Sequence, residues 1–491
     1  MEEKGRQLDK HNYRTDKNGW NYVHVEGNAF ERGCCYGRLM AGEIMAAVEE
    51  ASRLTELQTG LDWEFLKISD LSILPKWRAW MEREPYREFL DELCGMAQGV
   101  KMEAGDCSLT VDDLILWNGY EELTGYWFPA AVDEIYNSLP GRPADRPVSV
   151  QAGRNGHRRM SSDDRCSAFI ASGSYTADGR IVMAHNSFTP FENCNYMNVV
   201  ADIVPADGHP FIMQSQPGYI HSLSDFYETR TGEGKGLMIT ETTIGGFSVY
   251  DCDGAPEFVR IRYAVQYART LDEFVKLFWR NNNGGYANTW LVGDIETNEI
   301  MRFEAGLKFY RVDRTKDGYY AGFNAPLDAR IRNLECTDSG FADIRRHQGA
   351  RQVRIPQLLE EYKGKLDNET AQRILADHYD IYLERENPCS RTVCSHYELD
   401  KREYMSQPGR PVPFEPRGAV DGVTACTHDA LRLSLWCRWG SSCGMPFDAG
   451  EFLQKHPQFE HLREFLKDRP SKPWTRFGHM ATPDGTLAGR R

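Results

Sequence analysis

Cys166 stands at a boundary between two kinds of sequence, and its position suggests nucleophilic chemistry. The preceding residues 139–165, LPGRPADRPVSVQAGRNGHRRMSSDDR, are rich in Pro, Gly, Arg, Ser and Asp and have no apolar period. The residues that follow, CSAFIASG, are apolar and small, as is typical of a buried strand. The boundary therefore predicts an exposed segment that suits chain cleavage, followed at once by a strand.

Cleavage of the Arg165–Cys166 bond would give Cys166 both a nucleophile and a base. An α-amine has a reference pKa near 8, so at neutral pH it is partly free to accept the proton of its own thiol. The thiol can also start the cut by attacking the carbonyl of Arg165 and forming a thioester that water hydrolyses. Ser167 and Ala168 are small and would leave the end of the strand open to substrate. The alternative is that Cys166 is one buried strand cysteine among thirteen.

The elements around this boundary differ on its two sides. Before it, residues 20–27 read as a strand, residues 28–49 and about 62–127 read as helical, and Gly33 and Gly37 in the first helix indicate close packing. After it come the strand patterns CSAFIASG, RIVMAHNSF, YMNVVADIV, PFIMQSQPG, GLMITETTI, NTWLVGD and EIMRFEAG. Helical patterns return in PEFVRIRYAVQYARTLDEFVKLFW, GARQVRIPQLLEEYKG and NETAQRILADHYD.

Strand blocks flanked by helix blocks predict an α+β fold in which helices cover antiparallel sheets. We expect three regions along the chain. Residues 1–138 form a mostly helical N-terminal region packed on the core, residues 139–165 a flexible processing segment, and residues 166–491 the catalytic core.

Composition excludes several classes of function. The formal net charge of −14 and the absence of Lys/Arg runs argue against a nucleic-acid partner. No apolar run reaches the roughly 18 residues of a membrane span, and the first 20 residues have no apolar core of a signal peptide. We therefore expect either a cytoplasmic protein or the mature form of a secreted or lysosomal-type protein.

The aromatic content of 12% suits a lipid-like or aromatic acyl pocket. The sequence leaves open whether the protein forms a homo-oligomer.

The cysteines and histidines do not predict a metal site. The pairs Cys389 with Cys394 and Cys437 with Cys443 do not have the CxxC spacing of zinc sites. Cys426 and His428 also fit no usual zinc pattern. Neither a metal nor an organic cofactor is therefore expected.

The order of motifs along the chain resembles the phospholipase B-like proteins, which are grouped with penicillin acyltransferases and bile-salt hydrolases among the N-terminal nucleophile (Ntn) hydrolases. These motifs are CSAFI, VMAHNSF, GLMITETTIGG and GGYANTWLVGD in the middle of the chain, GNAFERGCCYGRLMAGEI and LDELCGMAQGV before them, and SRTVCSHYELD and GAVDGVTACTHDAL after them. The resemblance implies a four-layer αββα sandwich of two antiparallel sheets, self-cleavage before the cysteine, and hydrolysis or transfer of an acyl group, usually from an amide.

The resemblance also implies roles for single residues. Cys166 matches the nucleophile, and His185 with Asn186 matches a pair that orients the thiol, the amine or the substrate. Asn288 matches an oxyanion donor, a role typically worth a hundredfold or more in rate. Arg391 matches an arginine that holds a carboxylate or helps the site electrostatically. Asp421 and Thr424 also fall in a family motif, and Phe188, Thr242, Tyr286 and Trp290 are expected to line the substrate pocket.

This chain departs from the family pattern after its His-Asn pair, where relatives commonly carry Thr-Trp and this chain has Ser187-Phe188. The change keeps a hydroxyl and an aromatic ring, so we expect it to alter the shape of the pocket more than its chemistry. Purely structural roles are the alternatives for three residues. His185 would be a core histidine, Asn288 part of a turn, and Arg391 an ion-pair partner.

The sequence thus predicts an autoprocessed N-terminal cysteine hydrolase that cleaves an amide or ester acyl bond of a small or lipid-like substrate. Three alternatives stay open. The same acyl-enzyme could pass its acyl group to an amine, which would make the protein an acyltransferase. The chain could also be a non-catalytic binding or scaffold protein on the same fold, or a proenzyme that needs acid pH or another protease to mature.

Overall fold

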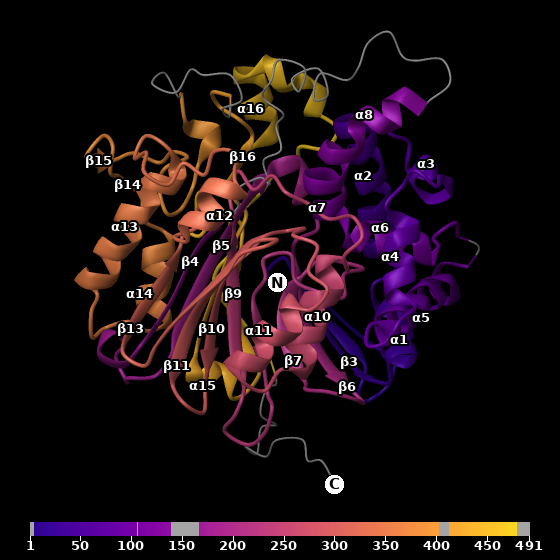
Figure 1. The fold of residues 1–491 in the computed structure, drawn as a ribbon, viewed down its shortest axis with the longest axis horizontal. Coiled ribbons are helices and arrows are strands. Elements are labelled where there is room, and N and C mark those ends of the chain that lie inside the picture. Colours follow the sequence, from indigo (N-terminus) through magenta and orange to yellow (C-terminus); the bar gives the residue numbers. More distant parts are fainter. Residues whose placement is uncertain (1–3, 106, 139–165, 402–411, 479–491) are drawn as a thin grey trace.

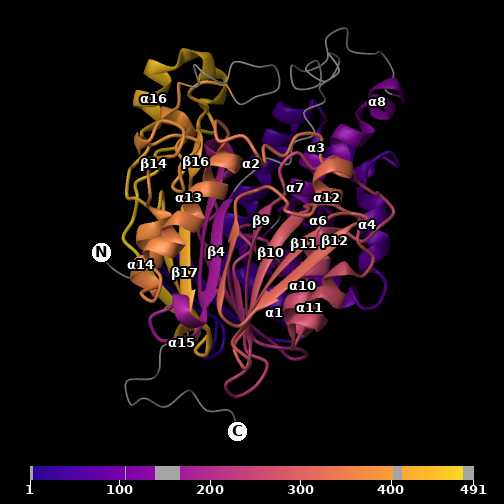
Figure 2. The same cartoon turned by 60° about the vertical axis from the view of Figure 1, so that its left-hand side comes forward.

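Two β-sheets lie face to face, and each carries helices on its outer face (Figures 1 and 2). The computed structural model describes residues 4–105, 107–138, 166–401 and 412–478. Figure 2 shows the layers in succession, with α13 and α14 outside one sheet and α10 and α11 outside the other. The protein is therefore an α+β sandwich of four layers, as the sequence predicts.

The larger sheet has ten strands in the order β1-β2-β3-β6-β7-β8-β9-β10-β11-β12. All neighbours are antiparallel except β3 and β6, which pair in parallel from Asn21 opposite Val199 to Gly27 opposite Pro205. The bounds are β1 Lys4–Gln7, β2 Tyr13–Lys17, β3 Trp20–Gly27, β6 Val199–Pro205, β7 Phe211–Ser215, β8 Tyr227–Thr229, β9 Leu237–Thr243, β10 Asn288–Asp294, β11 Glu299–Ala305 and β12 Tyr310–Thr315.

The smaller sheet has the order β13-β4-β5-β17-β18-β19, and β16 also pairs with β5. A separate two-stranded ribbon consists of β14 and β15. The bounds are β13 Gly318–Gly322, β4 Cys166–Ser172, β5 Val182–Pro190, β16 Arg417–Ala419, β17 Asp421–Cys426, β18 Ser434–Trp439, β19 Thr475–Gly478, β14 Tyr379–Asp380 and β15 Arg385–Glu386.

Helices outside the larger sheet form most of the main hydrophobic core. They are α1 Ala29–Leu39, α2 Ala41–Thr59, α3 Trp63–Ile68, α4 Leu74–Met81, α5 Arg87–Ala104, α6 Val111–Asn118, α7 Tyr120–Glu122, the π-helical η1 Leu123–Trp127, α8 Phe128–Ser138, α10 Glu257–Tyr267 and α11 Leu271–Trp279. Outside the smaller sheet, α13 His347–Glu361 and α14 Asn368–Leu375 cover a second core. The remaining helices are α12 Ala329–Leu334, α15 Thr427–Ala430, α16 Ala449–Lys455 and the 3₁₀ turns η2 Gly173–Tyr175, η3 Phe191–Asn193, η4 Tyr397–Leu399 and η5 Pro457–Leu462.

The helix expected over residues 28–49 is two helices, and the single-helix prediction is wrong at Met40. Asn28 caps the start of α1 through a capping box with Glu31. The chain leaves the helical conformation at the buried Met40, and α2 begins at Ala41. The close packing predicted for α1 is confirmed, since a Cβ added at Gly33 would lie 2.0 Å from the carbonyl oxygen of Glu92 in α5.

Residues before the expected processing segment also build the larger sheet. β1, β2 and β3 extend it beyond β6, which follows Cys166 in the chain. The N-terminal region is thus helical with an added three-stranded edge, and the proposed division into regions stays a prediction. No helix within the described ranges is long and apolar enough to cross a membrane.

Candidate active site

Cys166 is the first residue of β4, between β13 and β5 in the smaller sheet, and it is buried. Its backbone N–H donates to Oδ1 of Asn324 at 3.2 Å, just beyond the end of β13. Its carbonyl accepts a hydrogen bond from the guanidinium of Arg351 in α13. Both backbone groups of the cysteine are therefore held by side chains from other parts of the smaller-sheet half.

The thiol of Cys166 lies near two further polar groups from two different strands. It donates to Oε1 of Glu241, in β9 of the larger sheet, at 3.7 Å. His185 lies on β5, and one donor atom from each of Cys166, His185 and Glu241 falls within 4.8 Å of the others. The sandwich thus brings a thiol, an imidazole and a carboxylate to one place between its two sheets.

His185 is fully buried, and burial lowers the pKa of its imidazole to about 3. Neither of its ring nitrogens has a hydrogen-bond partner among the described residues. The imidazole is consequently neutral at physiological pH and keeps one donor and one acceptor position for a group that enters the site.

Arg351 and Asn324 form a bracket behind the cysteine. Nη2 of Arg351 donates to Oδ1 of Asn324 at 2.8 Å, and Nη1 donates to Oγ of Ser167 at 3.2 Å. The guanidinium also lies over the ring of Phe188, 5.0 Å from its centroid. Because Arg351 is completely buried, these contacts fix the start of β4 against α13.

Asn186 supports the same strand end from the next strand. Its Oδ1 accepts from the backbone N–H of Ser167 at 3.2 Å, and its Nδ2 donates to the carbonyls of Leu375 and Val393 at 3.1 and 3.2 Å. All the polar atoms of Asn186 are thus used on backbone groups. In this state its contacts are those of a residue that positions the strand beside Cys166.

Asn288 begins β10 and pairs with Thr243 of β9. It is fully buried, and neither atom of its side-chain amide has a hydrogen-bond partner among the described residues. Burying an amide without partners costs free energy, so a vacant amide in a native fold suggests a use for its hydrogen bonds. Asn324 reaches the same place, because its Nδ2 donates to the carbonyl of Thr243 at 2.8 Å.

A sequence comparison matches the family model named Phospholipase B to residues 84–343. This range contains Cys166, His185, Glu241, Asn288 and Asn324. The chain belongs to the phospholipase B family. The resemblance to phospholipase B-like proteins is thereby confirmed, whereas the relation to Ntn hydrolases stays a prediction.

Three relatives of this phospholipase B family member show how far the similarity extends. The chain is 24% identical over 280 residues to an uncharacterized protein of Archaeoglobus fulgidus, covering 56% of the chain and 42% of the relative. It is 25% identical over 284 residues to putative phospholipase B-like 1 of Caenorhabditis elegans, covering 51% and 49%. It is 34% identical over 100 residues to putative phospholipase B-like 2 of Bos taurus, covering 19% and 16%. The chain spans less than half the length of each of these relatives.

Three residues that the sequence predicts to line the substrate pocket of this phospholipase B family member have different neighbours. Thr242 is buried beside Gly322, where an added Cβ would come within 2.5 Å of the threonine methyl group. Tyr286 accepts a hydrogen bond from the hydroxyl of Thr243 at 3.3 Å. Trp290 packs edge-on against Phe274 and Phe278 of α11 in the main core.

Arg391 lies in its own buried ion-pair cluster. Its guanidinium forms two hydrogen bonds with the carboxylate of Asp380 and approaches Asp400 at 3.6 Å.

Phe188 packs with Cys394 and Ala419 beneath the guanidinium of Arg351. Arg165 lies outside the described residues.

Asp421 and Thr424, singled out from a family motif, both lie on β17. Asp421 accepts hydrogen bonds from the backbone of Ser187 at 3.1 Å and from the hydroxyl of Ser224 at 2.9 Å. Burial raises the pKa of its carboxyl group. Through Ser187, Asp421 supports the strand residue that pairs with Cys166.

The group of Cys166, His185 and Glu241 could also ligate a metal ion. Thiolate, imidazole and carboxylate are all zinc donors, and three protein ligands leave one position for water, as in catalytic zinc sites. A metal would occupy the thiol that nucleophilic attack needs, so the two uses of Cys166 exclude each other. The expectation that the active site holds no metal stays a prediction.

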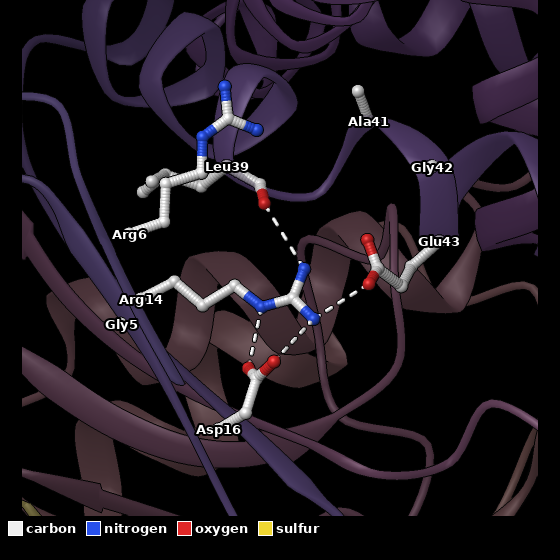
Figure 3. Close-up of a pocket in the computed structure, with 8 residues that line it drawn as sticks. All are labelled: Gly5, Arg6, Arg14, Asp16, Leu39, Ala41, Gly42 and Glu43. Atoms are coloured by element: carbon white, nitrogen blue, oxygen red, sulfur yellow. Dashed lines mark hydrogen bonds and ion pairs between the residues drawn. The ribbon is translucent and has the colours of Figure 1, made fainter. Parts of the chain in front are cut away.

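A surface cavity of about 290 Å³ lies elsewhere, between the N-terminal strands and the start of α2 (Figure 3). The guanidinium of Arg14 lies in this cavity. It pairs with the carboxylates of Asp16 at 2.7 Å and Glu43 at 2.6 Å, and it donates a hydrogen bond to the carbonyl of Leu39 at 3.2 Å. Since two carboxylates already neutralise this guanidinium, it offers no unmatched charge to an anionic ligand. None of the predicted site residues lines this cavity.

Sequence reasoning did not single out Glu241, Asn324 or Arg351. Glu241 carried a signal, because a carboxylate inside the apolar strand GLMITETTI would be costly to bury without a purpose. Nothing in the sequence marks Asn324 or Arg351 as functional, since each is an ordinary polar residue after a strand or within a helix.

Proposed function

We propose that this protein is an N-terminal cysteine hydrolase, activated by cleavage before Cys166, that cleaves an amide or ester acyl bond of a small or lipid-like substrate. One observation carries the proposal. The backbone nitrogen and the thiol of Cys166 both meet polar side chains at the same place, Asn324 on one side and Glu241 with His185 on the other. A residue that serves as its own base needs both atoms held in this way.

In the processing step, the thiol of Cys166 attacks the carbonyl carbon of Arg165. The C–N bond breaks, the acyl group passes to sulfur as a thioester, and the released nitrogen takes up the thiol proton. Water then hydrolyses the thioester to leave the carboxylate of Arg165 and a free thiol. Asn324 is placed to accept a hydrogen bond from the new α-amine, because it already accepts one from this nitrogen.

In turnover, the α-amine takes the proton of the thiol, and the sulfur attacks the carbonyl of the substrate. The vacant side-chain amide of Asn288 is the candidate donor to the oxyanion. The protonated amine then gives its proton to the leaving group, and water attacks the thioester in a second passage through the same steps.

The neutral His185 contributes by hydrogen bonding rather than by charge, since burial keeps it unprotonated at physiological pH. Glu241 places a carboxylate beside the thiol. The fold and the family membership support a hydrolase of the phospholipase B type. The name of the Caenorhabditis elegans relative suggests a phospholipid substrate, and the thioester chemistry equally serves amides.

The first test is the intact mass of the purified protein beside its Cys166→Ala and Cys252→Ala variants. We expect two fragments from the wild type and from Cys252→Ala, with one fragment beginning at Cys166, and a single chain from Cys166→Ala. Processed protein is then assayed with N-acyl amides and lysophospholipids, with and without an added amine acceptor.

Each outcome of this test is informative. Release of the free carboxylic acid from the substrate, with no amide product, supports hydrolysis. Formation of a new amide when the amine is present makes the protein an acyltransferase. A single uncut wild-type chain, even after incubation at acid pH, contradicts the proposal and favours a binding protein. Cleavage that persists in Cys166→Ala would mean that another protease cuts the chain.

A further inference from the structure

A second cluster of sulfur and nitrogen donors lies outside the proposed active site. It consists of His378 just before β14, Cys394 and His396 in the loop before η4, and Cys443 in the loop after β18. One donor atom from each of the four residues lies within 4.8 Å of all the others. Three segments that are distant in sequence therefore place two thiols and two imidazoles at one point.

The distances within this cluster match those of a tetrahedral metal site. Nε2 of His396 lies 3.5 Å from Sγ of Cys394 and 3.5 Å from Sγ of Cys443. Zinc–sulfur bonds of about 2.3 Å and zinc–nitrogen bonds of about 2.05 Å, set at the tetrahedral angle, put nitrogen and sulfur ligands about 3.6 Å apart. The side chains would need only small movements to close around an ion.

Groups around the cluster orient it as the outer partners of metal ligands do. Nδ1 of His396 lies 2.7 Å from Oε1 of Glu398, which leaves Nε2 to face the two sulfurs. A carboxylate behind a ligating histidine is the usual outer partner in zinc sites. The backbone N–H of Met445 donates to Sγ of Cys443 at 3.4 Å, as suits a thiolate. Nε2 of His378 is buried and has no hydrogen-bond partner among the described residues.

We propose that His378, Cys394, His396 and Cys443 bind a zinc ion. Four protein ligands fill a tetrahedral shell and leave no position for substrate, which is the pattern of a structural site. Two thiolates also balance the charge of the ion. The long and unequal spacing of the ligands hid this site from the sequence, which predicts no metal.

The zinc site braces the strands that carry the proposed nucleophile. Val393, next to Cys394, accepts hydrogen bonds through its carbonyl from Asn186 and from the hydroxyl of Ser167. Cys394 itself packs against Phe188, and Cys443 lies against the same small cluster. An ion here would tie the loop after β18 to the loop that holds the start of β4. The four ligands lie outside the proposed active site, so zinc binding does not depend on the proposed function.

The test is the metal content of the purified full-length protein, measured by mass spectrometry of the elements after exhaustive dialysis. We expect about one zinc ion per chain, as a closed Cys₂His₂ site requires. The variants Cys394→Ser, Cys443→Ser and His396→Ala should lose most of it. The variants Cys252→Ser and Cys166→Ala should keep the zinc. Cys252 is not part of the cluster, and Cys166 belongs to the other candidate ligand group, with His185 and Glu241.

A second measurement needs no variant and so does not depend on folding of the mutants. Cys443 and Cys252 are both partly exposed, which makes them a matched pair for alkylation of the native protein. We expect Cys443 to react slowly until a zinc chelator is added and Cys252 to react at the same rate throughout. In protein reloaded with cobalt, a thiolate-to-cobalt absorption band should appear and should be lost in Cys443→Ser.

Three results would overturn the zinc site. One is wild-type protein, reduced and then incubated with zinc, that holds no tightly bound ion. Another is a disulfide between Cys394 and Cys443, seen as a cross-linked peptide two hydrogens lighter than the reduced pair. The third is zinc content that is unchanged in all three ligand variants.

Discussion

The backbone nitrogen of Cys166 lies 3.2 Å from Oδ1 of Asn324, a residue 158 positions later in the chain. The amide of Asn324 donates to the carbonyl of Thr243, so its oxygen is fixed as an acceptor facing Cys166. That oxygen suits a peptide N–H in the uncut chain and equally suits an α-amine in a processed one.

Asn324→Ala should therefore lower the activity of the processed enzyme. A hydrogen bond to a charged group is worth roughly 1.5–3 kcal/mol, which corresponds to a loss of about ten- to a hundredfold in kcat. Asn198→Ala, which removes a surface hydrogen bond to the carbonyl of Gly19, is the control. Steady-state kinetics on equal amounts of folded protein make the comparison, and equal activity of the two variants would argue against a role for Asn324.

Glu241→Gln should make Cys166 react faster with a small alkylating reagent. A carboxylate beside a thiol disfavours the thiolate, and the thiolate is the form that reacts. We expect a several-fold rise in the rate of modification by iodoacetamide at neutral pH, followed by peptide mass spectrometry. A slower reaction would instead assign Glu241 the role of a base that draws the proton from the thiol.

His185 should make the protein less stable in acid. Its folded pKa of about 3 lies below the ordinary value of 6.5, so the unfolded chain binds the proton more readily. Its contribution is complete above pH 6.5 and is lost as the pH falls toward 3, which amounts to about 2 kcal/mol between pH 7 and pH 5. His221 is depressed to about 3 by burial as well, and adds a slope of the same sign.

Urea denaturation at several pH values measures this effect. His185→Gln removes one titrating group, so its free energy of unfolding should fall less steeply with acid than that of the wild type. Asn198→Ala removes no titrating group and should keep the wild-type slope. Identical slopes for all three proteins would show that His185 is not held neutral in the fold.

Gly95→Ala should destabilise the protein strongly. A Cβ at this position would lie 2.1 Å from the carbonyl oxygen of Phe30, where α1 and α5 cross. We expect a loss of about 3 kcal/mol or more, since neither backbone can withdraw without unpacking the helix pair. Gly42→Ala on the exposed side of α2 meets no atom within 4 Å and should keep the wild-type stability or raise it by up to about 1 kcal/mol. Equal midpoints of thermal unfolding for the two variants would contradict this packing.

Arg391→Gln separates a structural from a catalytic role for this arginine. It leaves the buried carboxylate of Asp380 without its main partner, which typically costs roughly 3–5 kcal/mol. The double variant with Asp380→Asn should lose less than the sum of the single losses, and kcat per folded molecule should hardly change. A hundredfold fall in kcat at unchanged stability would restore the catalytic role that the family resemblance implies.

Much of the framework could be predicted because many strands are short segments rich in apolar and aromatic residues and bounded by turn residues. WNYVHVEG matches β3 to the residue, and NTWLVGD matches β10. Short or polar strands escaped, as in β12, where YRVDRT is partly or fully exposed and has no apolar alternation. The break at Met40 escaped because nothing in AFERGCCYGRLMAGEI marks a bend.

The site residues that could be predicted are those that fall in motifs resembling the family's. His185 and Asn186 fall in VMAHNSF, on the strand paired with β4, and Asn288 falls in GGYANTWLVGD. Asn324 and Arg351 reach Cys166 across 158 and 185 residues, through the packing of β13 and α13. Such contacts depend on how layers pack, and no local pattern reports them.

The parallel pairing of β3 with β6 joins residues on the two sides of the proposed cut. A cut before Cys166 would turn one polypeptide into two chains that share a single sheet, held together only by the fold they made while still connected. Chains separated by heat or denaturant would have lost the tether that brought β3 to β6. Maturation would thus make unfolding irreversible. The mature two-chain protein would persist because it unfolds slowly, and its separated chains would not refold together.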